Sequence, residues 1–104
     1  MDEATLLFLT LIIKSQETNN ETLHKIYITR SYIMRTESML MLVNHFGEAS
    51  PIFQRKGELE NSKMDLEVIL SDLEESFRKQ QKTLQELYQN LEELLNRLKS
   101  LPKA

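Results

Sequence analysis

Apolar residues in the second half of the chain recur at alternating steps of three and four residues. Because a repeat of about 3.5 residues keeps one stripe of a helix against a neighbouring helix, this spacing predicts a coiled-coil helix with a left-handed supercoil. The predicted interaction seam consists of Leu66, Leu70, Leu73, Phe77, Gln80, Leu84, Leu87, Leu91, Leu94, Leu98 and Leu101. The other positions of this segment are mostly polar and favour a helix with a solvated outer face.

Gln80 is the single polar residue in this seam. One polar residue among leucines can fix the register or the oligomeric state of a coiled coil, at some cost in stability. Two interpretations stay open on the sequence alone. Gln80 either pins the register, or it lies at the edge of the seam with its amide in solvent.

The first half of the chain is also predicted to be helical, with a stripe of Leu23, Ile26, Ile33 and Leu40 that is widened by Tyr27, Met34 and Met41. Two stretches in this half are apolar on every face of a helix. A helix of that kind must be surrounded, so we expect these stretches to bind a partner. The predicted partner-binding residues are Leu6, Leu7, Phe8, Leu9, Ile12 and Ile13 in one stretch, and Met39, Leu40, Met41 and Leu42 in the other.

Turn-forming residues occur mainly between the two halves. Gly47 suits the end of a helix, and Ser50 followed by Pro51 suits the start of the next. We therefore predict a first helix over residues 1–46, a turn over 47–51 and a heptad helix over 52–101, in one domain. The polar stretch 14–22 is a possible break, and such a break would allow a three-helix monomer. The predicted fold is all-α: a long antiparallel helical hairpin with coiled-coil packing, completed into a bundle by other chains.

Composition narrows the possible functions. The chain has no cysteine, so it offers neither a disulfide framework nor a thiolate nucleophile. The formal net charge is −3 and no basic face emerges, which disfavours nucleic acid as a partner. The first residues are acidic and the apolar run that follows is too short to span a bilayer. We therefore expect no membrane span and a location inside the cell, in the cytoplasm or nucleus.

One pair of residues has metal-ligand spacing. Glu21 and His24 are three residues apart, as in the Glu-x-x-His pairs of di-iron helical bundles. A metal-binding four-helix bundle is therefore a remote alternative, because the glutamates of the second half fall mostly outside its seam. We predict no cofactor, no metal site and no catalytic residues, and hence no small-molecule substrate and no enzymatic activity.

The pattern as a whole favours a non-catalytic coiled-coil subunit or scaffold that assembles with itself or with other helical subunits of a multi-protein complex. Kinetochore, spindle and tethering assemblies contain such rods, and that comparison is by analogy only. The alternative is a homodimeric helical adaptor or regulator that binds a client helix.

Overall fold

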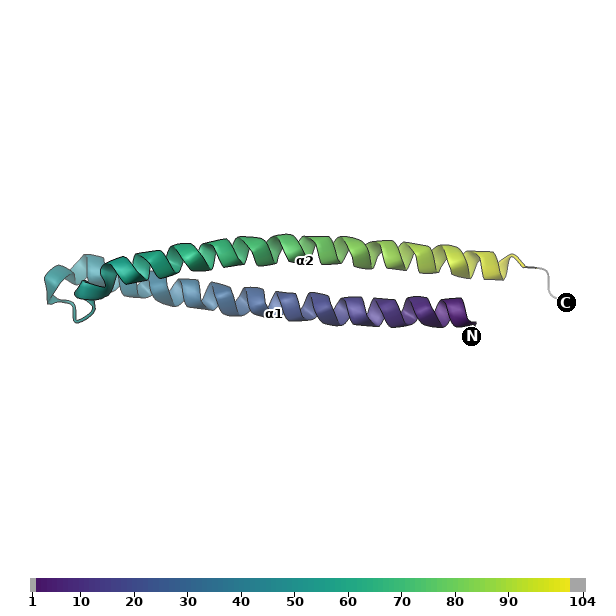
Figure 1. Cartoon of the computed structure of the whole chain (residues 1–104), viewed down its shortest axis with the longest axis horizontal. Helices are drawn as coiled ribbons and strands as arrows, with labels where there is room; N and C mark the ends of the chain where they lie inside the picture. Colours follow the sequence, from purple (N-terminus) through teal and green to yellow (C-terminus); the bar gives the residue numbers. More distant parts are fainter. Residues whose placement is uncertain (1, 102–104) are drawn as a thin grey trace. The chain divides into compact units, whose positions relative to one another are not determined.

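The computed structural model describes residues 2–101, and these residues contain two long helices and no strand (Figure 1). Helix α1 spans Glu3–Phe46 and helix α2 spans Lys56–Lys99. Two short 3-10 helices, η1 (Gly47–Ala49) and η2 (Phe53–Arg55), lie between them. The chain divides into two compact units. One is formed by residues 23–75, here called the hairpin unit, and the other by the described residues 2–22 and 76–101, here called the paired unit.

The hairpin unit is a helical hairpin, in which the second half of α1 lies antiparallel to the first half of α2 (Figure 1). Three apolar side chains of α1 are buried in it: Ile26, Ile33 and Val43. The short connection makes the antiparallel arrangement the direct consequence of the sequence, because a few residues can only return the chain alongside itself.

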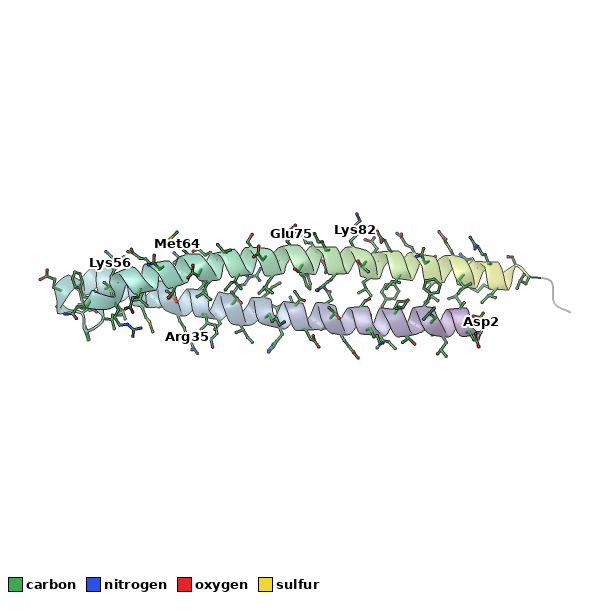
Figure 2. The ribbon with its side chains drawn as sticks, in the orientation of Figure 1. Asp2, Arg35, Lys56, Met64, Glu75 and Lys82 are labelled. Atoms are coloured by element: carbon green, nitrogen blue, oxygen red, sulfur yellow. The ribbon has the colours of Figure 1, made fainter. Side chains whose placement is uncertain are left out.

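The paired unit contains the first half of α1 and the second half of α2, which also run side by side in opposite directions (Figure 2). Ile12 is its most buried apolar residue, with 5% of its surface exposed. The leucines of α2 in this unit are mostly half-buried and lie on the side that faces α1. Each unit is therefore two helices thick, with a core one seam wide.

Helix α1 begins with an aspartate cap. The backbone N–H of Thr5 donates a hydrogen bond of 2.7 Å to Oδ1 of Asp2. This satisfies one of the donors that the first turn of a helix leaves free. The hydrogen bond from Thr5 to the carboxylate holds the pKa of Asp2 below its ordinary value, because it stabilises the charged form.

Helix α1 continues without interruption through residues 14–22. In this stretch the Thr18 hydroxyl donates to the Lys14 carbonyl four residues earlier, at 3.0 Å, and so bonds within the helix instead of capping a new one. With no glycine or proline in the stretch, nothing in the backbone forces a break.

The connection between the helices is longer than the predicted turn. Gly47 has φ +56°, the left-handed conformation in which glycine commonly ends a helix. Ser50 is extended because the following Pro51 disfavours helical backbone at the residue before it. Two 3-10 hydrogen bonds, from Phe53 N to Ser50 O and from Arg55 N to Ile52 O, then lead into α2 at Lys56.

Helix α2 ends at Lys99, and its last turn is closed by bonds from Ser100 N to the Asn96 and Arg97 carbonyls. Leu101 therefore lies beyond the helix, with 60% of its surface exposed. Pro102, which the sequence suggests as the residue that stops this helix, lies outside the described residues.

Candidate interaction surfaces

Threonines form much of the inner face of α1. In the hairpin unit the buried positions of α1 follow the alternating three- and four-residue spacing of a coiled coil. They are Ile26, Thr29, Ile33, Thr36 and Val43, with the half-buried Leu40 completing the series. The stripe predicted from the sequence contains Ile26, Ile33 and Leu40 of this seam, but it misses Thr29, Thr36 and Val43. The signal that reveals the whole seam is the alternation of isoleucine and threonine at heptad spacing.

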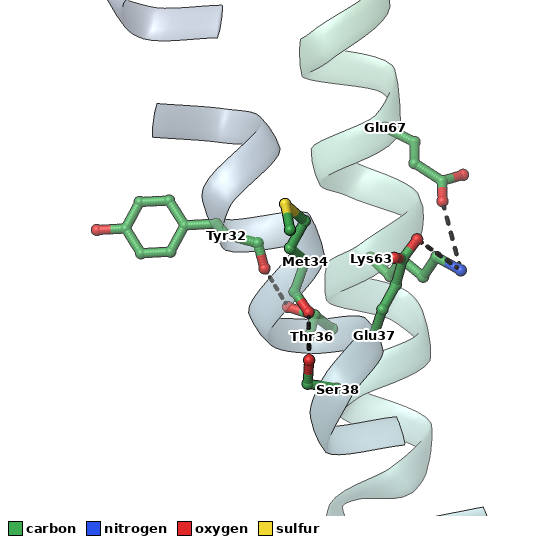
Figure 3. A network of polar contacts seen from close by, with 7 residues as sticks. All are labelled: Tyr32, Met34, Thr36, Glu37, Ser38, Lys63 and Glu67. Carbon is green, nitrogen blue, oxygen red and sulfur yellow. Dashed lines mark hydrogen bonds and ion pairs between the residues drawn. The ribbon is translucent and has the colours of Figure 1, made fainter. Parts of the chain in front are cut away.

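Three of the four buried threonine hydroxyls of α1 are satisfied within their own helix, whereas the hydroxyl of Thr5 is buried without a partner. In the hairpin unit Thr29 donates to the Lys25 carbonyl at 2.8 Å, and Thr36 donates to the Tyr32 carbonyl at 2.9 Å (Figure 3). In the paired unit Thr22 donates to the Thr18 carbonyl at 3.1 Å. Because each of these hydroxyls has a partner four residues earlier, threonine can face α2 without leaving an unpaired polar atom.

The predicted seam of α2 lies on the inner side of both units, except at its C-terminal end. Its half-buried members in the hairpin unit are Leu66, Leu70 and Leu73, and those in the paired unit are Phe77, Gln80, Leu84, Leu87, Leu91 and Leu94. Leu98 and Leu101 are exposed. The inner face of α2 is therefore apolar and bulky, whereas that of α1 is partly polar and small.

Gln80 takes part in a polar layer within the paired unit. The Asn19 amide nitrogen lies 3.3 Å from Oε1 of Gln80 and 3.3 Å from the Phe77 carbonyl oxygen, and it donates to both. Asn19 is buried, with 8% of its surface exposed. Further along the same unit, Gln16 donates a short hydrogen bond to the hydroxyl of Tyr88. The polar residue of the leucine seam thus has a partner on α1 that was not predicted from the sequence.

A lysine occupies one seam position of the hairpin unit. Nζ of Lys63 lies 3.5 Å from Glu37 of α1 and 3.8 Å from Glu67 of α2 (Figure 3). About a third of the Lys63 side chain is exposed, so its ammonium group reaches the solvent while its stem covers the seam. Exposed pairs of this kind contribute little stability, but they connect the two helices.

The residues predicted to bind a partner divide into two groups. Ile12 is buried and Phe8, Leu9 and Leu40 are half-buried, so these four pack inside their own units. The exposed group consists of Leu6, Leu7 and Ile13 in the paired unit, and Met39, Met41 and Leu42 in the hairpin unit. Only the exposed group is available to another molecule.

The hairpin unit has the larger set of exposed apolar side chains on α1, here called the outer apolar face. It consists of Tyr27, Ile28, Tyr32, Met34, Met39, Met41, Leu42 and Phe46, which are between 42% and 71% exposed. Tyr27, Met34 and Met41 therefore do not widen the buried stripe as the sequence suggested. In Figure 3 the ring of Tyr32 points away from α2. These side chains leave the seam because it accommodates residues of only two heptad positions on each helix.

Neither a metal cluster nor a membrane span occurs among the described residues. Glu21 and His24 are both exposed. Within residues 2–101, no three His, Asp or Glu side chains gather closely enough to hold a metal ion. No helix in that range combines the length and apolar character that crossing a bilayer requires.

The fold and its surfaces place the chain among all-α proteins whose antiparallel helices pack through heptad seams. Comparison with protein-family models, with curated protein sequences and with solved structures finds no match to this chain. The functional argument therefore depends on the chain's own surfaces.

Proposed function

We propose that this chain is a non-catalytic interaction module that joins a multi-protein assembly through the outer apolar face of α1. The observation that supports the proposal is the combination of a threonine-containing inner seam with eight large apolar side chains left outside it. A helix that packed only within its own hairpin would have large apolar residues on the inner side and polar residues on the outer side.

The size of the outer apolar face supports the proposal. An aromatic side chain covers about 150–250 Å² when it is fully buried. Three of the eight side chains are aromatic, and at about half exposure the whole set offers on the order of 600 Å² of apolar surface. An α-helix turns by about 100° per residue, so Tyr27, Met34 and Met41 lie on a different side of α1 from the other five side chains. Apolar surface is therefore exposed on two sides of this helix.

The heptad spacing on α1 indicates the kind of partner. Helices whose apolar residues recur at this spacing accept other helices, because side chains of one insert between those of the next. We therefore propose that the outer apolar face receives helices of another subunit, and that the assembly has the form of a helical bundle.

The test compares the wild-type chain with Met39→Glu/Leu42→Glu, which places charges on the outer apolar face without touching the inner seam. The matched control, Ser31→Glu/Ser38→Glu, adds the same charge at two exposed serines of the same helix. Each chain is produced in its native cells, and its size in the extract is measured by gel filtration.

We expect the wild type and the serine control to migrate as part of a larger assembly and Met39→Glu/Leu42→Glu to migrate alone, because buried charges oppose association. Circular dichroism of the purified chains checks that helicity is unchanged. If all three chains migrate as free chains of the same size, the proposed function is wrong.

A further inference from the structure

A second line of residues at heptad spacing runs along α1. Here called the second seam, it consists of exposed residues that each directly precede a buried or half-buried residue of the inner face. They are Leu7, Leu11, Lys14, Thr18, Glu21, Lys25, Ile28, Tyr32, Arg35, Met39 and Leu42. One residue turns an α-helix by about 100°, so this line lies about a right angle away from the face that packs on α2. A helix at the corner of a four-helix bundle has its two neighbours at such an angle.

The order of side chains along the second seam suits a second copy of the chain in antiparallel orientation. The middle of the seam is polar, whereas its two ends are mostly apolar. In one antiparallel register Glu21 of one copy lies opposite Lys25 of the other, and the heptad spacing then sets Leu7 opposite Met39. Apolar ends therefore meet apolar ends, and the opposite charges in the middle meet each other.

Two hollows beside the second seam carry opposite charge. In the paired unit, Lys14 of α1 and Lys79 of α2 line a hollow of about 290 Å³. In the hairpin unit, Tyr32 of α1 and Asp65 of α2 line a hollow of about 430 Å³. The antiparallel register that pairs Glu21 with Lys25 also sets Lys14 of one copy opposite Tyr32 of the other. The positively charged hollow of each copy then faces the negatively charged hollow of its partner.

The charge of each whole unit favours the same orientation. The hairpin unit contains six basic and nine acidic residues, a net charge of −3. The described residues of the paired unit contain six basic and seven acidic residues, a net charge of −1. Contact between two hairpin units would therefore bring the larger like charges together, whereas contact of a hairpin unit with a paired unit involves weaker repulsion.

The second seam also offers the apolar area that a dimer requires. Its six large apolar side chains are between 40% and 59% exposed, and they are Leu7, Leu11, Ile28, Tyr32, Met39 and Leu42. At about 150 Å² for each fully exposed side chain, they provide on the order of 400 Å² of apolar surface in each copy. A stable interface takes roughly 800 Å² from each partner, and a little over half of that area is apolar.

We infer that the second seam binds a second copy of this chain in antiparallel orientation, so that the paired unit of each copy packs on the hairpin unit of the other. This inference rests on the proposed function, because it names the subunit that the outer apolar face receives. In a twofold dimer each contact occurs twice, since both of its sides lie on the same helix of each copy. The long helices of the two copies then form a bundle.

The first experiment measures the mass of the purified full chain by sedimentation equilibrium over a range of concentrations. We expect the wild type to be a dimer. Glu21→Lys and Lys25→Glu each place like charges opposite each other in the dimer, so each should raise the dissociation constant at least about tenfold. An equimolar mixture of the two variants should form dimers again, because the two chains then carry opposite charges at both facing positions.

The matched control for these charge variants is Lys82→Glu. It makes the same change in charge as Lys25→Glu, at an exposed position of α2 outside the second seam. This variant should remain a dimer with the dissociation constant of the wild type. Circular dichroism of every variant checks that helicity is unchanged.

A second set of variants tests which side of α1 forms the interface. Met39→Glu/Leu42→Glu places two charges on the second seam and should convert the dimer to a monomer, because buried charges oppose association. Met34→Glu/Met41→Glu adds the same charges in the same unit, but these residues follow the inner positions of α1 instead of preceding them. The control should therefore stay a dimer.

Crosslinking tests the orientation, because the chain has no cysteine of its own. Chains with Leu7→Cys and chains with Met39→Cys are mixed and treated with a short bismaleimide. We expect crosslinks between the two kinds of chain and few between chains of one kind. Ser38→Cys in place of Met39→Cys is the control, since Ser38 is exposed on another side of the same turn and should crosslink much less.

Four results would overturn the inference: a wild-type monomer at every concentration, a dimer that neither charge variant weakens, crosslinks of Leu7→Cys chains only with each other, and a monomer that binds anionic vesicles. A purified monomer that still migrates within a larger assembly in the native extract would leave the proposed function standing, because the partner would then be another protein. A chain that is monomeric when purified and free in the native extract would end both proposals.

Discussion

Helices α1 and α2 each contain 44 residues, yet they distribute their apolar side chains differently. In α2 the leucines face inward and the outer positions are mostly charged, so this helix resembles an ordinary surface helix. In the hairpin unit, α1 presents threonines to α2 and leaves tyrosines, methionines and Phe46 outside. The apolar side of α2 is therefore covered within the chain, whereas much of the apolar surface of α1 is not.

The two helices differ in the side chains that occupy their inner positions. In the hairpin unit the inner face of α2 carries leucines, whereas two of the six inner positions of α1 are threonines. Threonine suits them because its hydroxyl bonds to its own helix, as Thr29 and Thr36 do. The large apolar side chains of α1 that lie outside the seam are exposed and can contact another molecule. Substitutions on the two helices should therefore differ in their effects, described here from the largest to the smallest.

Charges placed in the seam of α2 should have the largest effect. Leu84→Asp or Leu91→Asp should lower the free energy of unfolding by about 3–5 kcal/mol, because each removes a half-buried leucine and forces a carboxylate against α1. Chemical denaturation followed by circular dichroism measures the loss. The adjacent exposed Gln85→Asp is the control and should change stability by less than about 0.5 kcal/mol. Normal stability of both leucine variants would contradict the assigned register.

Shortening side chains on the two faces of α1 should lower the free energy of unfolding on the inner face and leave it nearly unchanged on the outer face. Ile26 is 2% exposed, so Ile26→Ala should cost about 2–4 kcal/mol through lost burial and the cavity left behind. Met34 is 66% exposed, and Met34→Ala should cost less than about 0.5 kcal/mol in the isolated chain. Denaturation curves of the two variants give the comparison. Equal losses would mean that both faces of α1 are covered in the isolated chain.

The polar layer of the paired unit should behave non-additively. Gln80→Leu alone should cost about 1–2 kcal/mol, because it takes one of the two acceptors from the buried Asn19 amide. The double variant Asn19→Leu/Gln80→Leu should regain most of that loss, since no buried amide is then left without its partner. A double-mutant cycle of unfolding free energies measures the coupling. Strictly additive losses would show that the 3.3 Å contact between Asn19 and Gln80 contributes nothing.

Replacing a seam threonine by valine should have a small effect. Thr29→Val removes a hydroxyl that bonds to the Lys25 carbonyl and adds a methyl group of similar size facing the leucines. The lost hydrogen bond and the gained apolar contact oppose each other, so we expect a change within about 1 kcal/mol in either direction. Thermal unfolding measures it. A large destabilisation would show that the threonine hydroxyl also bonds across the seam.

The smallest effect concerns the cap of α1. The pKa of Asp2 is lowered in the folded state, so its capping contribution is present above the unfolded pKa and is lost as pH falls through the folded pKa. The amide signal of Thr5 in NMR spectra should report this loss in acid, because Thr5 donates to the Asp2 carboxylate. Asp2→Ala should abolish that pH dependence. A Thr5 signal that titrates identically in both proteins would contradict the cap.

The inner face of α2 was predictable from Leu66 to Leu94, whereas that of α1 was predictable only at Ile26, Ile33 and Leu40. The seam of α2 from Leu66 to Leu94 follows from spacing alone, because a run of leucines at heptad positions rarely arises in a helix that packs against nothing. Asn19 and the threonines of α1 escaped prediction because polar residues in a helix usually face solvent. Their burial depends on bonds within the helix and on what α2 places opposite, and neither can be read from hydropathy.

By itself, the sequence determined that the chain forms two long helices joined by a short connection. Helix-favouring residues, two prolines and two glycines leave little other choice, and the heptad leucines orient α2. The sequence also placed Ile26, Ile33 and Leu40 on one stripe of α1. Only the tertiary structure decided that Thr29 and Thr36 belong to the same covered face and that Tyr27, Met34 and Met41 do not. The physical reason is that each threonine hydroxyl bonds to its own helix and can therefore be buried, which hydropathy does not register.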